Sequence, residues 1–206
     1  MIATSLQFDE ATHTYTLDGE VLPSVTQVLE GVGIIDYSHI PSATREMALE
    51  RGSLVHRVTH WDDEGDLDDG SVDEAVAPFL QSWRQFRADM GFVPAVIERR
   101  GHHEVYRYAG TLDRIGTVGG ADWLVDIKTN DAPDWVRMQT AAYAAFDPEP
   151  SRFKRVAVEL KATGRVPYQI IERKGSQFGE DFNDFLAALR VWQLRLECNG
   201  HLRRVI

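Results

Sequence analysis

The chain has 206 residues, of which 22 are basic and 32 acidic, and 43% are hydrophobic. This length predicts one compact domain over residues 1–206, and the hydrophobic content excludes general disorder. The single Cys cannot form an internal disulfide, nor can it alone hold a zinc ion or an iron–sulfur cluster. No apolar run could span a bilayer, and the first residues do not resemble a signal peptide, so we expect a cytoplasmic protein without a membrane partner.

The first elements that we expect along the chain are a hairpin and two helices, all before residue 62. Residues 12–17 and 20–25 flank Asp18-Gly19, a dipeptide typical of a two-residue hairpin turn. A short helix follows, and a second helix is expected to open at Ser42. Residues at spacings of four, three and four predict one face of this second helix: Ala48, Gly52, Val55 and Thr59.

The acidic charge is concentrated in residues 62–74, which hold eight acidic side chains and no basic one. Asp, Gly and Ser throughout this run predict a solvated acidic loop, and its glycines do not fit the calcium-binding EF-hand pattern. The rest of the chain has 22 basic against 24 acidic residues. The net charge of −10 therefore does not exclude a nucleic-acid partner, because a basic groove can still lie outside the acidic run.

The hydrophobic period changes from helical to strand-like after Gly91. The expected elements are a helix over 75–90, strands over 93–100, 105–118 and 121–129, a helix over 134–146, a hairpin of 153–160 with 166–172, and a helix over 182–196. This order predicts a mixed α/β fold in which helices flank a central mixed sheet of about four to five strands.

The chemically informative segment is residues 110–129. If Gly119-Gly120 forms a two-residue turn, Asp113 lies directly opposite Asp126, and opposed residues share a face of the sheet. Lys128 lies two residues beyond Asp126 and projects from the same face. The sequence therefore predicts two carboxylates and one ammonium group on one side of a hairpin.

Two opposed carboxylates repel each other unless a cation neutralises them, and hard divalent cations prefer oxygen ligands. The alternative is a surface hairpin in which Asp126 and Lys128 simply pair in solvent. Apolar neighbours place this strand inside a sheet, where unpaired charges are costly, and this favours the metal site.

These residues resemble the signature of the PD-(D/E)XK nucleases, with Asp113 as its first acidic residue and Asp126-Ile127-Lys128 as its second half. Three further motifs are similar to those of the RecB-like branch, which includes phage exonucleases: residues 52–56 match GxxxH, 110–113 match GxxD, and 139–143 match QxxxY. The resemblance covers about residues 20 to 196, and all four motifs are in the family's order. Leu112 stands where the superfamily's name has proline.

The resemblance implies a restriction-endonuclease-like core that binds Mg²⁺ or Mn²⁺. His56, Asp113 and Asp126 would be metal ligands, together with the backbone carbonyl of Ile127, and Lys128 would orient the attacking water. Glu98, on the preceding strand, would help to bind metal or water. Without its motif, His56 is better explained as a buried or partnered histidine.

The resemblance also implies contacts with nucleic acid. Gln139 and Tyr143 share a helix face, and in the family such residues steady the active site and contact the nucleic acid; packing alone also explains the pair. Candidate phosphate contacts are basic residues near the motifs: Arg45, Arg51, Arg99, Arg100, Arg114 and Lys161. If several line one groove, binding should weaken steeply with salt.

The expected function is metal-dependent hydrolysis of DNA by an exonuclease of phage-type recombination or repair. A homo-oligomer is possible for such an enzyme, as is a recombination or single-strand-binding partner protein. The chain has neither an ATP-binding loop nor the cysteines of an iron–sulfur cluster. The alternatives are a structure-selective endonuclease, and a module that binds DNA ends or a protein without cleavage.

Overall fold

The computed structural model describes residues 5–129 and 131–199. A five-stranded sheet has the order β4-β5-β6-β7-β8, in which only β6 and β7 pair in parallel. Its strands are β4 (Val93–His103), β5 (Tyr108–Val118), β6 (Ala121–Lys128), β7 (Lys154–Leu160) and β8 (Tyr168–Arg173). The predicted mixed α/β fold with a central mixed sheet is confirmed.

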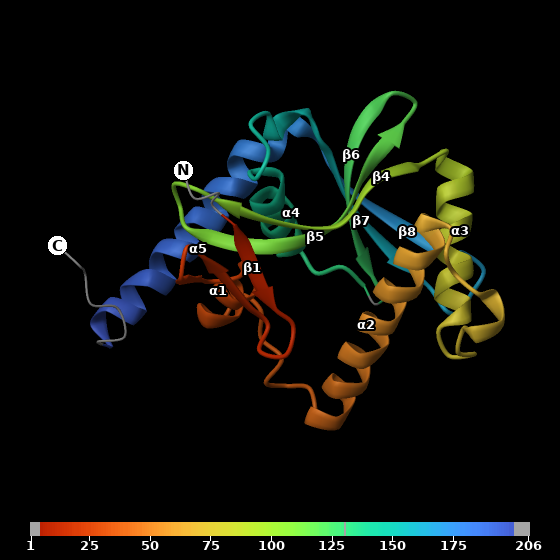
Figure 1. The fold of residues 1–206 in the computed structure, drawn as a ribbon, viewed down its shortest axis with the longest axis horizontal. Coiled ribbons are helices and arrows are strands. Elements are labelled where there is room, and N and C mark those ends of the chain that lie inside the picture. The colour runs from red at the N-terminus through yellow and green to blue at the C-terminus, as the bar shows by residue number, and fades with distance from the viewer. Residues whose placement is uncertain (1–4, 130, 200–206) are drawn as a thin grey trace.

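Helices cover both sides of this sheet (Figure 1). The α-helices are α1 (Val25–Gly31), α2 (Ser42–Glu64), α3 (Ala77–Met90), α4 (Val136–Ala144) and α5 (Phe178–Cys198). Short 3₁₀ helices are η1 (Asp69–Ser71), η2 (Pro150–Arg152) and η3 (Gly175–Gln177). None of the helices in the described ranges is long and apolar enough to cross a membrane.

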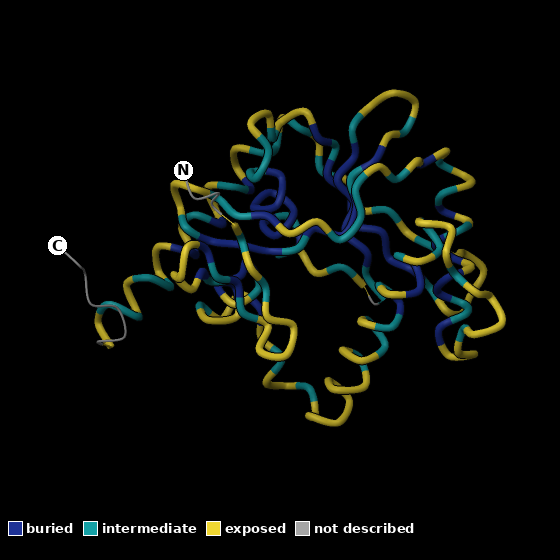
Figure 2. The backbone as a smooth tube through the Cα atoms, viewed as in Figure 1, coloured by how far each residue is buried: buried dark blue, intermediate teal, exposed yellow. Residues whose placement is uncertain are grey.

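Two hydrophobic cores lie against the sheet. One is formed with α1, α4 and α5, and the other with α2 and α3. Alternate residues of β6 enter different cores, since Leu124 belongs to the first and Val125 to the second. Figure 2 shows the resulting buried backbone at the centre of the molecule, whereas the outer part of α2 is exposed.

A small second sheet has the order β1-β2-β3, with β1 (Leu6–Asp9), β2 (Thr14–Leu17) and β3 (Glu20–Leu22). Asp18 and Gly19 both have positive φ, 53° and 85°, as the two-residue turn requires, so the predicted hairpin is confirmed. Tyr15 and Leu17 pack with Ala109 of β5 and thereby attach the small sheet to the large one. The sequence did not predict β1.

The predicted start of the acidic loop, at residue 62, is too early in the chain. Helix α2 continues to Glu64, and Gly65 ends it in the left-handed conformation. The side chains of Asp62 and Asp63 are only 10% and 0% exposed, because both pair with arginines. The start of the acidic run is therefore a packed helix end and not a solvated loop.

Two other boundaries also differ from the expectation. Strand β4 runs on to His103, where the sequence predicted a turn. Helix α4 begins at Val136, two residues after the predicted start at 134; its N-cap is Trp135, and the Asp134 side chain pairs with Arg137.

Candidate functional site

The hairpin of β5 and β6 has the predicted register. Its pairs run from Val118 opposite Ala121 to Arg114 opposite Val125. The same register, continued by one step, places Asp113 opposite Asp126. The backbone N–H of Ile127 donates to Asp113 Oδ2 at 2.7 Å, so the Asp113 side chain reaches across to β6.

Three potential metal ligands meet from three different elements. His56 of α2, Glu98 of β4 and Asp113 of β5 each offer one ligand atom, and these atoms lie within 4.8 Å of one another. His56 Nδ1 is 3.3 Å from Glu98 Oε1 and 3.6 Å from Asp113 Oδ1. The predicted roles of His56 and Glu98 thus fall on residues that the fold brings together.

Asp126 lies outside this group of three and holds Lys128. Its Oδ2 is 2.8 Å from Lys128 Nζ, and its side chain is 3% exposed. Lys128 Nζ also donates to Gln139 Oε1 at 3.2 Å, so the ammonium group is oriented from two sides. The predicted cluster of Asp113, Asp126 and Lys128 is therefore present where the middle of β5 meets the C-terminal end of β6, and its lysine is already paired.

Crowding of like charges changes the titration of this cluster. Burial, together with the charges of Asp126 and Glu98, raises the pKa of Asp113 to about 6, although His56 opposes the rise. Burial lowers the pKa of His56, but the charges of Asp113 and Glu98 outweigh it and raise this pKa to about 9. Neighbouring carboxylates contribute to both raised pKa values, so negative charge is concentrated at this site.

The donor set fits a divalent cation. Carboxylate oxygens are the preferred ligands of Mg²⁺ and Mn²⁺, and a neutral imidazole nitrogen is a common additional metal ligand. A cation beside Glu98 and Asp113 would replace the proton on His56 and relieve the repulsion that raises the pKa of Asp113. The residues present therefore fit a divalent metal ion.

Glu98 adopts a backbone conformation that is uncommon for its residue type. Its φ is 46°, in the left-handed region, although it lies inside strand β4. The recorded pairs pass from Ile97 opposite Arg114 to Arg99 opposite Leu112, and skip Glu98. The irregularity lets the carboxylate reach both His56 and Arg114, and such local strain is frequent at functional sites.

The predicted contact of Arg114 with nucleic acid is wrong. Its side chain is 0% exposed, and it bonds Asp63 at 2.6 Å, Glu98 at 3.0 Å and Thr59 at 3.1 Å. No surface that DNA could reach includes its guanidinium group. Arg114 instead joins Glu98 of β4 to helix α2.

Gln139 and Tyr143 lie on α4 beside Lys128, as the predicted motif requires. Gln139 donates to Tyr143 Oη at 3.2 Å and accepts from Lys128. Gly110, the first residue of the GxxD motif, packs directly on Tyr143, since a Cβ there would lie 2.5 Å from Tyr143 Cε1. The two motifs thus meet in space, and Tyr143 also lines the adjacent cleft.

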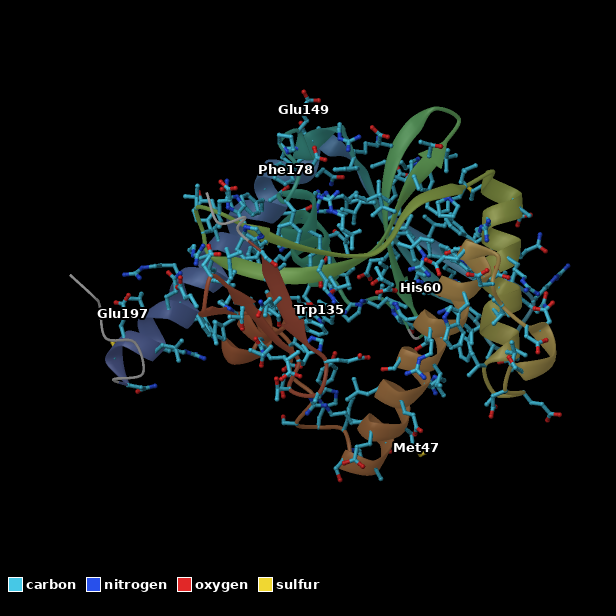
Figure 3. The ribbon with its side chains drawn as sticks, viewed as in Figure 1. Met47, His60, Trp135, Glu149, Phe178 and Glu197 are labelled. Atoms are coloured by element: carbon cyan, nitrogen blue, oxygen red, sulfur yellow. The ribbon has the colours of Figure 1, made fainter. Side chains whose placement is uncertain are left out.

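A cleft of about 990 Å³ opens beside the potential metal ligands His56 and Glu98. Its walls include His56, Glu98 and Lys128, together with the cations Arg57 and Arg100. Figure 3 labels two further lining residues, His60 on α2 and Trp135 before α4. The cleft is thus bounded by α2, the small sheet, strand β4 and the segment before α4.

The predicted phosphate contacts are only partly in this cleft. Arg100 lines it, whereas Arg51 lies elsewhere on α2 with its guanidinium 5.8 Å from the Phe79 ring centroid. A phosphate contact by Arg51 stays a prediction. Lys161 pairs with Asp131 and Glu159.

Sequence reasoning missed Asp63 and strand β1 of the small sheet. Asp63 continues the spacing of Val55 and Thr59 by four residues, so the helical period already placed it on the buried face. Its position inside an acidic run hid this signal. For Phe8 and Tyr15, which line the cleft from the small sheet, no local pattern indicates a functional position.

Comparisons with known proteins give limited information. No protein-family model matches the chain, and no curated protein is similar to it in sequence. Its structure is similar to that of an alkaline exonuclease from Laribacter hongkongensis, with 14% identity and a TM-score of 0.38, over 86% of this chain and 91% of that chain. At this score the similarity assigns neither a family nor a function to this chain.

Proposed function

We propose that this protein is a divalent-metal-dependent deoxyribonuclease of the PD-(D/E)XK type. The observation that carries the proposal is the convergence of His56, Glu98 and Asp113 within 4.8 Å, beside Lys128 in an open cleft. A purely structural ion-pair cluster needs no access to solvent. His56 and Glu98 instead line a cleft of about 990 Å³, and Asp113 Oδ1 is 3.6 Å from His56 Nδ1.

His56, Glu98 and Asp113 would hold Mg²⁺ or Mn²⁺, with Asp126 and the backbone carbonyl of Ile127 as further proposed ligands. When bound, such an ion supplies Lewis-acid stabilisation of phosphoryl oxygens and lowers the pKa of water. Lys128 orients the attacking water toward phosphorus and donates to charge that develops on the phosphate. Gln139 keeps the Lys128 ammonium in place through its 3.2 Å contact.

Burial lowers the pKa of Lys128, but the charges of Asp126 and Asp113 outweigh it and raise the pKa above its ordinary value. Lys128 therefore stays a cation near neutral pH. A cation serves as a hydrogen-bond donor and electrostatic stabiliser, and it cannot act as a general base. The water must then lose its proton to another acceptor, such as a phosphate oxygen or bulk solvent.

The finer proposals are an exonuclease mode, a role in phage-type DNA recombination or repair, action as one domain, and assembly with further copies or a partner protein. An endonuclease that selects DNA structure is the alternative enzyme. A non-cleaving DNA-binding module is less consistent with retention of Lys128 beside two buried carboxylates, because unused buried charges are costly.

The first test is digestion of end-labelled linear and circular DNA with Mg²⁺, Mn²⁺ or EDTA. We expect metal-dependent cleavage that Lys128→Ala reduces on the order of 100-fold or more, because an electrostatic donor at the reacting phosphate is lost. Lys161→Ala is the matched control, since Lys161 is also a lysine held in ion pairs, with Asp131 and Glu159, but does not line the cleft.

Equal cleavage by wild type and a folded Lys128→Ala variant would show that the nuclease site is elsewhere. Digestion of linear DNA alone would support the exonuclease, and nicking of circular DNA would support the endonuclease. If calorimetry detected no binding of Mg²⁺ or Mn²⁺, the proposal of a metal-dependent nuclease would be wrong.

A further inference from the structure

Gly52 is an unusual residue for the interior of a 23-residue helix. Glycine stabilises a helix less than alanine does, and it is normally retained where a neighbour leaves no room for a side chain. A Cβ at Gly52 would meet nothing within 4 Å, in contrast to Gly110, whose Cβ would collide with Tyr143. Packing within the described structure therefore does not explain Gly52.

The open space at Gly52 belongs to the cleft. Gly52 and Ser53 line it, and one turn later His56 and Arg57 line it as well. Residues four apart share a helix face, so this part of α2 forms one wall that leads to the metal ligand His56. Arg57, which is exposed, places a cation on the same wall.

Aromatic side chains line the cleft from other elements. Phe8 comes from β1, Tyr37 from the segment after α1, and Trp135 from the segment before α4. Each is partly exposed, and cations accompany them: Arg100 is 4.7 Å from the Phe8 ring centroid, and Lys128 Nζ is 5.6 Å from that of Trp135. Partly exposed aromatic rings interleaved with cations are typical of surfaces that bind unpaired nucleotides.

We propose that the cleft binds an unpaired DNA strand, whose sugar–phosphate backbone passes closest to α2 at Gly52 and whose bases stack on the aromatic wall, Trp135 in particular. Taking DNA as the ligand rests on the proposed function. An unpaired strand fits better than a duplex, because the bases of a duplex already stack on each other and offer no free faces to aromatic rings. Arg57 and Arg100 would contact phosphates.

The test measures binding of a fluorescent single-stranded oligonucleotide and of a blunt duplex of the same length, in EDTA so that metal-dependent cleavage does not occur. We expect wild type to bind the single strand more tightly. Gly52→Ala should weaken this binding about tenfold, as one misplaced methyl group can. The same change should raise Tm by about 2 °C, because alanine favours the helix and finds free space.

Trp135→Ala should weaken single-strand binding about tenfold through lost stacking, and Trp135→Tyr should restore most of it. Trp61→Ala is the matched control, since Trp61 is a 43% exposed tryptophan of α2 that does not line the cleft. Thermal unfolding of each variant would show whether a loss of binding follows from a loss of folding.

Three results would overturn the inference: tighter binding of the duplex, unchanged affinity in Gly52→Ala, or equal losses in the Trp135 and Trp61 variants. If wild type cleaves DNA and any of these occurs, the unpaired-strand site is wrong and the nuclease stands. If the expected binding losses occur and no metal supports cleavage, the strand-binding site stands and the nuclease proposal is wrong.

Discussion

At the scale of single residues, each charged group of the site is held by another side chain or by the backbone. Arg114 bonds Glu98, the N–H of Ile127 bonds Asp113, and Gln139 bonds Lys128. Under the proposed function, such support would fix the ligands before a metal or substrate arrives and lower the cost of reorganisation during catalysis.

Arg114 gives the sharpest prediction at this scale. Arg114→Gln should lower the free energy of unfolding by about 3–5 kcal/mol, because Asp63 would lose its closest partner while its side chain stays fully buried. Denaturant unfolding measures this loss. The same change should also weaken metal binding, since Glu98 would lose the group that orients it.

Arg84→Ala is a suitable control, because Arg84 also pairs with two carboxylates, those of Asp62 and Asp69, but is 32% exposed. Its loss should cost about 1 kcal/mol or less after solvent screening. If Arg114→Gln instead kept full stability and lost only DNA affinity, Arg114 would be a DNA contact, as the sequence first suggested.

At the scale of elements, the contact between β5 and α4 joins two of the sequence motifs. Gly110 allows Tyr143 to pack against the strand, and Tyr143 in turn bonds Gln139, which holds Lys128. A change at Gly110 therefore reaches Lys128 through two side chains.

Gly110→Ala should cost about 1–3 kcal/mol in stability, because the added methyl group overlaps the Tyr143 ring and α4 must shift. We also expect lower turnover with a smaller loss of metal affinity, since Asp113 shares β5 with Gly110, whereas His56 and Glu98 lie on α2 and β4. Chemical denaturation, calorimetry and single-turnover cleavage measure the three quantities. A Gly110→Ala protein with wild-type stability and turnover would show that the contact between Gly110 and Tyr143 does not position Lys128.

At the scale of the whole molecule, a bound metal should stabilise the fold. A ligand at 100 times its Kd adds about 2.7 kcal/mol, which corresponds to a rise in Tm of roughly 5–10 °C for a protein of this size. Differential scanning calorimetry with Mn²⁺ or Mg²⁺, followed by EDTA, measures the rise and its reversal.

Asp113→Asn provides the control for this effect. It removes one of the repelling carboxylates, so the metal-free protein should be at least as stable as wild type while the metal-induced rise disappears. A rise of equal size in this variant would place the stabilising ion at another site.

A second network of buried charges connects elements of the C-terminal half of the fold. The Asp181 side chain is 0% exposed and pairs with Arg155 at 2.7 Å, Arg173 at 2.5 Å and Arg137 at 3.0 Å. It thus joins α5 to β7, β8 and α4. Burial raises the pKa of Asp181, but bonds to these arginines outweigh it and lower this pKa to about 2.

Because the pKa of Asp181 in the folded protein lies below its ordinary value of 3.8, the charged carboxylate stabilises the fold above about pH 4. This contribution should be lost as the pH falls from about 4 toward 2. Asp181→Asn should cost about 3 kcal/mol at pH 7 and should unfold with a shallower pH dependence below pH 4. Urea unfolding between pH 2 and 7 tests both, and an unchanged acid slope would contradict the assignment.

The amino-acid sequence alone determined the features that depend on local spacing. The Gly119-Gly120 turn fixed the register of β5 and β6, and so the position of Asp113, Asp126 and Lys128, because side chains alternate strictly along a strand. The helical period likewise predicted α2, with Val55 and Thr59 among its buried residues.

Tertiary structure alone decided which partners these residues meet. Arg114 and Asp63 look like surface charges in the sequence. In the structure they form an ion pair between β5 and α2, and both side chains are fully buried. The aromatic wall of the cleft comes from three segments far apart in the chain, and no local pattern encodes their approach. Spacing sets the direction of a side chain relative to its own element, whereas burial and pairing depend on the packing of elements against each other.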